Sequence, residues 1–216
     1  VLNSDQAQTF ELSDAAQRQR YFESAANTEA FFSFMGGMIN RRASWDRVSF
    51  PEAFDRSCWA HAARLFELMP KGLKLRFVPE CWQDRRPDND SFMGGGLVKR
   101  LALSIDGYNR IADTFFGHDS VEAFHVRRVV RDEIGIGSLI MGKYVCSLDP
   151  EIESRETLDR LAAKMYGDFS LKNLHARFLY ATTSGEKIKR WDPEWSAKEE
   201  KKALMRRAQR AAQAKA

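Results

Sequence analysis

Apolar residues at helical spacing recur along most of this 216-residue sequence, and no other feature constrains its fold as much. The segment 51–72 predicts the clearest helix, with one face formed by Phe54, Cys58, Ala62, Leu65 and Met69. The segments 120–135, 153–167 and 170–180 also predict helices, the last two through Leu158, Leu161, Ala162 and Met165 and then through Leu171, Leu174 and Phe178. A hydrophobic content of 44% is enough for a globular core.

Two short helices are predicted near the N-terminus, because residues that cap helices precede them. Ser13 or Asp14 would cap the first helix, and Asn27 would cap the second. The segment 96–117 is ambiguous, since Asp106-Gly107 could turn a hairpin, but its apolar spacing favours a helix.

Strand patterns are few. The segment "LKLRFV" (73–78) alternates apolar and basic residues, which is typical of a half-buried strand. We interpret "SLIMGKYVCSL" (138–148) as a hairpin or paired strands. The predicted fold class is therefore α+β and helix-rich, with several amphipathic helices, a small β-sheet or hairpin and a C-terminal basic helix.

The net charge of +4 is unevenly distributed. Residues 185–216 hold ten Lys and Arg against five Asp and Glu, which leaves 24 basic and 25 acidic groups in the remainder. The apolar stripe of the terminal segment is thin and mostly alanine. We therefore predict one globular, helix-rich domain over residues 1–184 and a basic C-terminal arm over 185–216, helical and exposed.

A ten-residue likeness occurs twice, as "SFMGGMINRR" (Ser33–Arg42) and "SFMGGGLVKR" (Ser91–Arg100). Backbone amides around paired glycines can bind anions, and the basic residues would add charge. However, the flanking sequences share nothing, whereas a duplicated unit would bring its surroundings with it. Two independent glycine turns are the favoured interpretation.

No catalytic arrangement can be specified from spacing. "GSLIMGK" (137–143) resembles a phosphate-binding loop, but Tyr144 follows where such a loop needs Ser or Thr. His118-Asp119, with His61 and either Asp149 or Asp159, could be ordered as the metal ligands of a helical phosphohydrolase; a capping role for Asp119 is simpler. We expect no catalytic residue, metal or cofactor, and an enzyme is not the favoured interpretation.

The candidate binding residues are cationic or aromatic. Most lie in the basic arm, where Trp beside Lys or Arg can stack on bases or anchor an interface; three more lie in "HVRRVVRDE" (125–133). The full set is Lys187, Lys189, Arg190, Trp191, Trp195, Lys201, Lys202, Arg206, Arg207, Arg210, Arg127, Arg128 and Arg131.

These features predict a non-enzymatic regulatory, adaptor or inhibitor protein that binds a macromolecular partner. The partner would be a protein held near Trp45, Trp59 or Trp82, with the basic arm contributing. One alternative is a nucleic-acid-binding accessory protein that uses the arm, and the other is the metal-dependent phosphohydrolase centred on His118 and Asp119. Three scattered cysteines and no apolar run of membrane-spanning length favour a cytoplasmic setting without membrane insertion.

Overall fold

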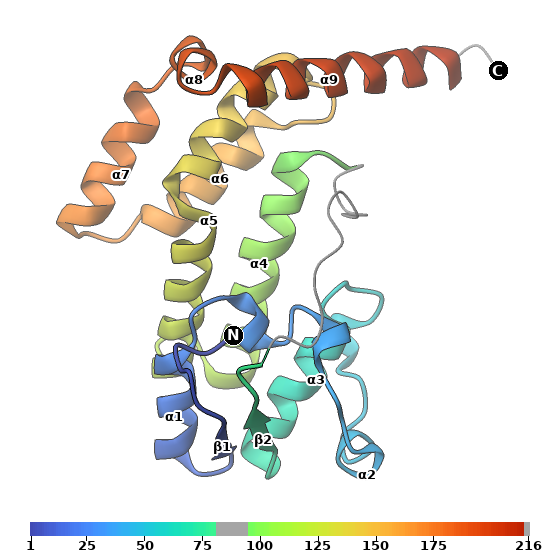
Figure 1. Ribbon diagram of the computed structural model, residues 1–216, viewed down its shortest axis with the longest axis vertical. Helices are drawn as coiled ribbons and strands as arrows, with labels where there is room; N and C mark the ends of the chain where they lie inside the picture. Colours follow the sequence, from blue (N-terminus) through green and yellow to red (C-terminus); the bar gives the residue numbers. More distant parts are fainter. Residues whose placement is uncertain (81–94, 214–216) are drawn as a thin grey trace. The chain divides into compact units, whose positions relative to one another are not determined.

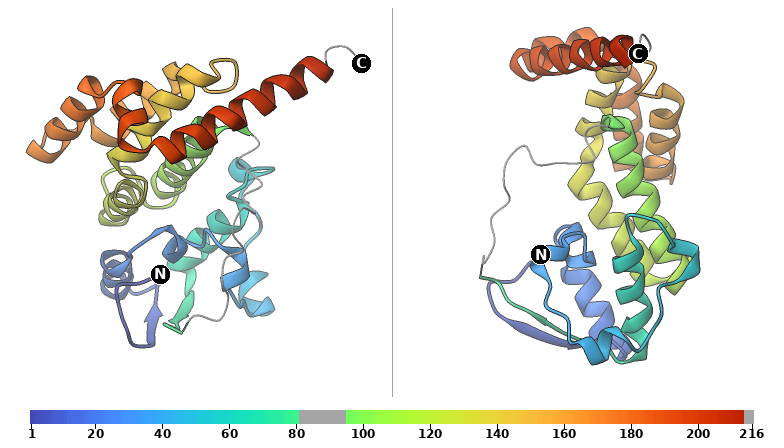
Figure 2. Two further views of the ribbon diagram at one scale, coloured as in Figure 1. Left: turned by 45° about the horizontal axis from the view of Figure 1, so that its top comes forward. Right: turned by 90° about the vertical axis from the view of Figure 1, so that its right-hand side faces the viewer.

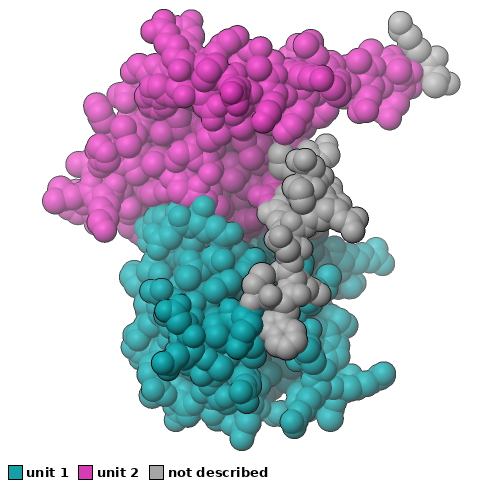
Figure 3. All heavy atoms as spheres, viewed as in Figure 1, with its two compact units in different colours: residues 1–89, 106–133 teal, residues 90–105, 134–216 magenta. Residues whose placement is uncertain are grey.

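The computed structural model describes residues 1–80 and 95–213 and divides the chain into two compact units (Figure 3). Unit 1 consists of residues 1–89 and 106–133, and unit 2 of residues 90–105 and 134–216. This differs from the predicted division at 184/185, because residues 185–213 are part of a larger unit that begins well before them.

The elements follow one another along the chain as Figure 1 labels them. The first part contains β1 (Gln8–Glu11), α1 (Ala15–Ser24), 3₁₀ turns at Thr28–Phe31 and Met35–Gly37, α2 (Arg42–Trp45), a 3₁₀ turn at Glu52–Phe54, α3 (Ala60–Leu68), a 3₁₀ turn at Met69–Lys71 and β2 (Lys74–Phe77). The second part contains α4 (Leu97–Phe116), α5 (Val121–Leu148), α6 (Arg155–Tyr166), α7 (Leu171–Thr182), α8 (Gly185–Trp191) and α9 (Pro193–Gln213). The described chain is thus helix-rich, with a small sheet, as predicted.

The sheet of the described residues has two antiparallel strands, with Gln8 opposite Phe77 and Glu11 opposite Lys74. The strand predicted at 73–78 is confirmed. The predicted strand near Leu139, which would have completed the sheet, is wrong. That segment is helical and lies within α5, where Leu139 is buried. The true partner, β1, has a single buried residue and therefore no clear alternation to detect.

The helix predicted over 51–72 is shorter than expected. Residues 52–54 form a 3₁₀ turn, Arg56 has a φ of 55°, and α3 begins only at Ala60. A left-handed residue interrupts an α-helix, so Phe54 reaches the core from a turn and stacks on Phe115 of α4 instead.

The two long helices contribute to both units. α4 runs through Gly107 without a break, which confirms the helical interpretation of 96–117. Its glycine is required there, because a Cβ at Gly107 would lie 2.0 Å from Nε1 of Trp59. In α5 the helical geometry is interrupted at Gly135, with φ 62° and ψ 162°, two residues beyond Glu133, where unit 1's second segment ends.

An aromatic cluster forms the core of unit 1. Phe22 is fully buried and contacts four other rings, those of Tyr21, Phe31, Phe66 and Phe116. Tyr21 donates a hydrogen bond to the carbonyl oxygen of Ala30, and burial raises the pKa of its hydroxyl. These residues come from α1, the first 3₁₀ turn, α3 and α4, so the cluster joins the sequence-distant parts of unit 1.

Unit 2 packs α6, α7, α8 and α9 around the second half of α5, and Figure 2 shows α8 followed directly by α9. Ile140, Tyr144 and Ile188 form a buried cluster against Leu179 and Trp195. No described helix combines the length and apolar content that crossing a bilayer requires.

Candidate functional site

The C-terminal helix packs one side into unit 2 and exposes the other. Asp192 caps it by accepting a hydrogen bond from the backbone N–H of Trp195, at 3.0 Å. Ser196, Glu199 and Ala203 then recur at i, i+3 and i+7, and all three are buried. The segment is therefore helical as predicted, but it is exposed on one side only.

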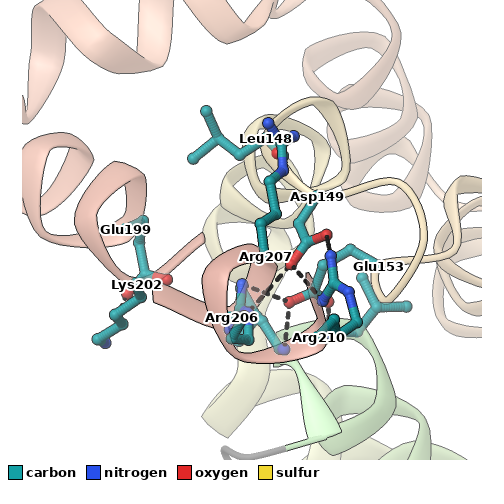
Figure 4. Close-up of polar contacts among 10 residues, drawn as sticks. Leu148, Asp149, Glu153, Glu199, Lys202, Arg206, Arg207 and Arg210 are labelled. Atoms are coloured by element: carbon teal, nitrogen blue, oxygen red, sulfur yellow. Dashed lines mark hydrogen bonds and ion pairs between the residues drawn. The ribbon is translucent and has the colours of Figure 1, made fainter. Parts of the chain in front are cut away.

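Two arginines of this helix bind one buried carboxylate (Figure 4). Asp149, just after the end of α5, has no exposed surface. Nε of Arg206 donates to Asp149 Oδ2 at 3.2 Å, and Nη2 of Arg210 donates to Asp149 Oδ1 at 2.8 Å. The four-residue spacing places both guanidinium groups on one side of α9, where each reaches a different carboxylate oxygen.

A second buried carboxylate, that of Glu153, links Arg206 to the start of α4. Its two oxygens accept hydrogen bonds from the backbone N–H groups of Leu97 and Val98, each at 2.9 Å, and Arg206 Nη2 lies 3.6 Å from Oε1. A negative charge at a helix N-terminus is favourable. Gly96 makes room for it, since a Cβ there would lie 2.7 Å from Glu153 Oε1.

The contact between Gly96 and Glu153 shows how the two similar segments, Ser33–Arg42 and Ser91–Arg100, differ in structure. In the second segment the turn at Gly96 leads into α4 and faces a carboxylate of the same chain. The first segment instead contains the 3₁₀ turn Met35–Gly37 in unit 1, and a Cβ at Gly37 would meet the ring of Phe34. Gly37 and Gly95, at matching positions, both have 3₁₀ geometry, but the segments differ after them, because Leu97–Arg100 are helical and residues 38–41 are not. Residues 91–94 lie outside the described residues.

The cluster favours the ionised form of Asp149. Burial alone would raise the pKa of this carboxyl, but hydrogen bonds and positive charge from Arg210 and Arg206 outweigh burial, and the pKa lies below its usual value. Because the folded pKa is below the unfolded one, this contribution to stability is complete above the unfolded pKa of about 4 and is lost as the pH falls further.

We therefore expect the free energy of unfolding to fall as the pH drops below about 4. Asp149→Asn should be less stable than the wild type at pH 7, because the arginines lose their anionic partner. The difference between the two proteins should shrink as the pH falls below about 4, where the carboxyl of the unfolded chain takes up a proton and the advantage of the folded, ionised Asp149 is lost. Urea unfolding of both proteins over this pH range measures the effect, and parallel curves would show that Asp149 is not responsible.

Several other predicted arm residues also have partners within unit 2. Arg207 donates to the carbonyl oxygen of Leu148, Lys189 pairs with Glu200 at 2.6 Å, and Lys202 pairs with Glu199 at 2.7 Å. Trp195 packs against Tyr144, with ring centroids 6.0 Å apart. The remaining predicted residues lie on exposed positions: Lys187, Arg190, Trp191 and Lys201.

The three predicted arginines of α5 belong to unit 1, not to the unit that contains the arm. Arg127 donates to Asp113 at 2.8 Å and to the carbonyl oxygen of His118. Arg128 pairs with Asp132 and donates to the carbonyl oxygens of Phe22, Glu23 and Ala25, which fastens the end of α1. Arg131 is half-buried on the same helix. Two of the three are thus anchoring residues of unit 1.

The residues considered as metal ligands are divided between the units. His61 and His118 lie in unit 1, where Nε2 of His61 faces the carbonyl oxygen of Phe32 at 2.9 Å. Asp149 and Asp159 lie in unit 2, and Asp159 accepts a hydrogen bond from the hydroxyl of Tyr180 at 2.6 Å. Over residues 1–80 and 95–213, no group of three or more His, Cys, Asp or Glu is placed to hold a metal ion. Ser120, not Asp119, caps α5 through the backbone N–H of Ala123.

Unit 1 also contains a polar groove that the sequence did not predict. It has a volume of about 550 Å³ and lies beside β1 and α1, with Phe10 among its lining residues. The side chains around it carry amide, hydroxyl, carboxylate and guanidinium groups, from Asn3, Gln8, Thr9, Arg20, Glu23 and Ser24. Both hydrogen-bond donors and acceptors therefore surround this groove.

No protein-family model matches this sequence, and no solved structure matches it. Among curated proteins, abequosyltransferase RfbV of Salmonella typhimurium strain LT2 is 22% identical to it over 100 residues. Those residues make up 46% of this chain and 30% of that transferase. The matched stretch thus spans less than a third of the transferase.

Proposed function

We propose that this chain is a carbohydrate-binding part of a glycosyltransferase. The similarity to abequosyltransferase RfbV carries this proposal, since the name of that protein describes transfer of a sugar. The match covers only part of both chains, so the proposal concerns recognition of a sugar or a sugar-bearing substrate by this chain.

The polar groove of unit 1 has the chemistry that such a ligand needs. A sugar presents hydroxyl groups that donate and accept hydrogen bonds in several directions. The groove offers amides from Asn3 and Gln8, the carboxylate of Glu23 and the guanidinium of Arg20. Arg20 would also suit a phosphate group attached to the sugar, because guanidinium binds phosphate in two-pronged geometry.

Saturation-transfer NMR with monosaccharides, oligosaccharides and nucleoside-diphosphate sugars tests this proposal. We expect transfer from the protein to the sugar protons of at least one class. Arg20→Ala should weaken that binding about tenfold, the usual effect of losing one charged hydrogen bond. Arg190→Ala is the matched control, because it removes an exposed arginine from unit 2.

Two results would contradict the proposal. One is the absence of saturation transfer to every sugar at millimolar ligand with folded protein. The other is equal weakening by Arg20→Ala and Arg190→Ala, which would indicate a general charge effect in place of a site in the groove.

Binding of an acidic macromolecule by the C-terminal arm remains a prediction. Fewer of the predicted arm residues are free to contact such a partner than the sequence suggested. Lys187, Arg190 and Lys201 are exposed, whereas Arg206 and Arg210 bind buried carboxylates. Removing the whole arm would therefore damage unit 2 as well as remove positive charge, so point variants of the exposed residues are the appropriate probes.

A further inference from the structure

Helix α7 presents its apolar side to solvent. Leu171, Leu174 and Phe178 stand at i, i+3 and i+7, the spacing of one helix face, and 82%, 54% and 62% of each residue is exposed. Phe169, two residues before the helix, is 95% exposed. The sequence predicts these residues for burial, so their exposure requires an explanation.

Polar contacts on the opposite side hold the helix in this orientation. Nζ of Lys143 in α5 donates to the carbonyl oxygens of Tyr180 and Thr183, at 2.6 and 2.7 Å, and so caps the C-terminal end of α7. The hydroxyl of Tyr180 donates to Asp159 of α6 at 2.6 Å, and Ala176 is buried. Rotating α7 to bury its leucines would break all of these contacts.

The charged residues of α7 itself are basic, and one exposed acid, Asp168, directly precedes Phe169. α7 contains Lys172, His175 and Arg177 and no acidic residue. At 100° per residue, Arg177 and His175 lie about 90° and 70° to either side of the centre of the apolar stripe. α8 follows with three basic residues, Lys187, Lys189 and Arg190, against one acid, Glu186, and with the largely exposed Trp191.

We propose that α7 docks on the surface of an anionic lipid bilayer, with Phe169, Leu171, Leu174 and Phe178 in the interfacial region. Helices that lie in this region have an apolar side flanked by Lys and Arg, with aromatic residues at the boundary. Side chains such as Arg177 can extend from the edge of the stripe toward lipid phosphates while their stems stay in apolar surroundings.

Charge and area both favour lipid over a protein partner. Two copies of α7 facing each other would bring cations against cations, since neither copy supplies an acid. The four exposed side chains offer roughly 500 Å² of surface, less than the roughly 800 Å² that each partner gives to a stable protein interface. An interfacial helix needs only such a stripe together with attraction to anionic headgroups.

Co-sedimentation of the full chain with vesicles tests this proposal. We expect binding to vesicles of phosphatidylcholine mixed with phosphatidylglycerol, weakening with salt, and much weaker binding to phosphatidylcholine alone. Phe169→Ser with Leu171→Ser should reduce binding to the mixed vesicles more than tenfold, and Arg177→Glu should reduce it severalfold. Leu204→Ser is the control, because Leu204 is 65% exposed on α9.

All of these substitutions are at exposed positions, so thermal unfolding followed by circular dichroism should be unchanged. Absence of binding to mixed vesicles at low salt would overturn the proposal, as would equal binding to both kinds of vesicle. It would also be overturned if Leu204→Ser weakened binding as much as the α7 variants. Concentration-dependent dimerisation that Leu171→Ser abolishes would instead identify a second copy of the chain as the occupant.

Discussion

Replacing Gly107 by alanine should destabilise unit 1 by about 2 kcal/mol, although alanine is the better helix former. The new methyl group would lie 2.0 Å from Nε1 and 2.4 Å from Cδ1 of Trp59, so the indole must move. That ring now packs against Tyr108, with centroids 4.5 Å apart, and Tyr108 is buried. The cost of displacing a packed indole exceeds the gain of about 1 kcal/mol from helix propensity.

Urea unfolding followed by circular dichroism and tryptophan fluorescence measures this effect. Gly137→Ala is a matched control: the same substitution in α5, where no atom lies within 4 Å of the added methyl group. It should raise stability by up to about 1 kcal/mol. If Gly107→Ala were as stable as Gly137→Ala, the close approach of Trp59 to α4 would be contradicted.

Replacing Arg206 by methionine should destabilise unit 2 by about 3 kcal/mol. Methionine preserves most of the side-chain volume but removes the charge that lies 3.2 Å from Asp149 and 3.6 Å from Glu153. Neither carboxylate has appreciable exposed surface, so water cannot replace the lost partner. An arginine at the end of an exposed arm would have no such effect.

Lys201→Met on the exposed side of the same helix is the control, with an expected change within about 0.5 kcal/mol. Combining Arg206→Met with Asp149→Asn should cost less than the sum of the single changes, because the double variant removes a charge from each side of the pair. Strict additivity of the two changes in urea unfolding would argue against direct coupling of Arg206 and Asp149.

Local signals predicted the helices well wherever caps and spacing agreed. Asp14 and Asn27 cap the elements that follow them, as predicted, and α4 and α6 follow their apolar spacing. The errors arose where tertiary contacts decide. Residues 138–148 contain a strand-like run, yet Gly142 lets α5 approach Leu158 of α6 so closely that the helix is favoured there.

The candidate site was less accessible to prediction from the sequence. The basic arm was recognised as a helix, but the internal partners of two of its arginines were not. Arg206 and Arg210 bind Asp149, and Arg206 also lies beside Glu153, more than fifty residues earlier in the chain. Asp149 and Glu153 are four residues apart in the sequence, and so are Arg206 and Arg210. This matching spacing was the signal in the sequence that could have indicated the pairing. Trp82, expected to contribute to partner binding, lies outside the described residues.

The way the chain alternates between the units limits how the protein can be dissected. Each unit is assembled from two separate stretches, and α4 changes from unit 2 to unit 1 between Ile105 and Asp106. Glu153 from the longer stretch of unit 2 holds the first turn of α4 from the shorter one. A single proteolytic cut or a simple truncation therefore releases neither unit intact. A fragment equivalent to unit 2 would need residues 97–105 joined by a linker to a segment that begins at Ile134.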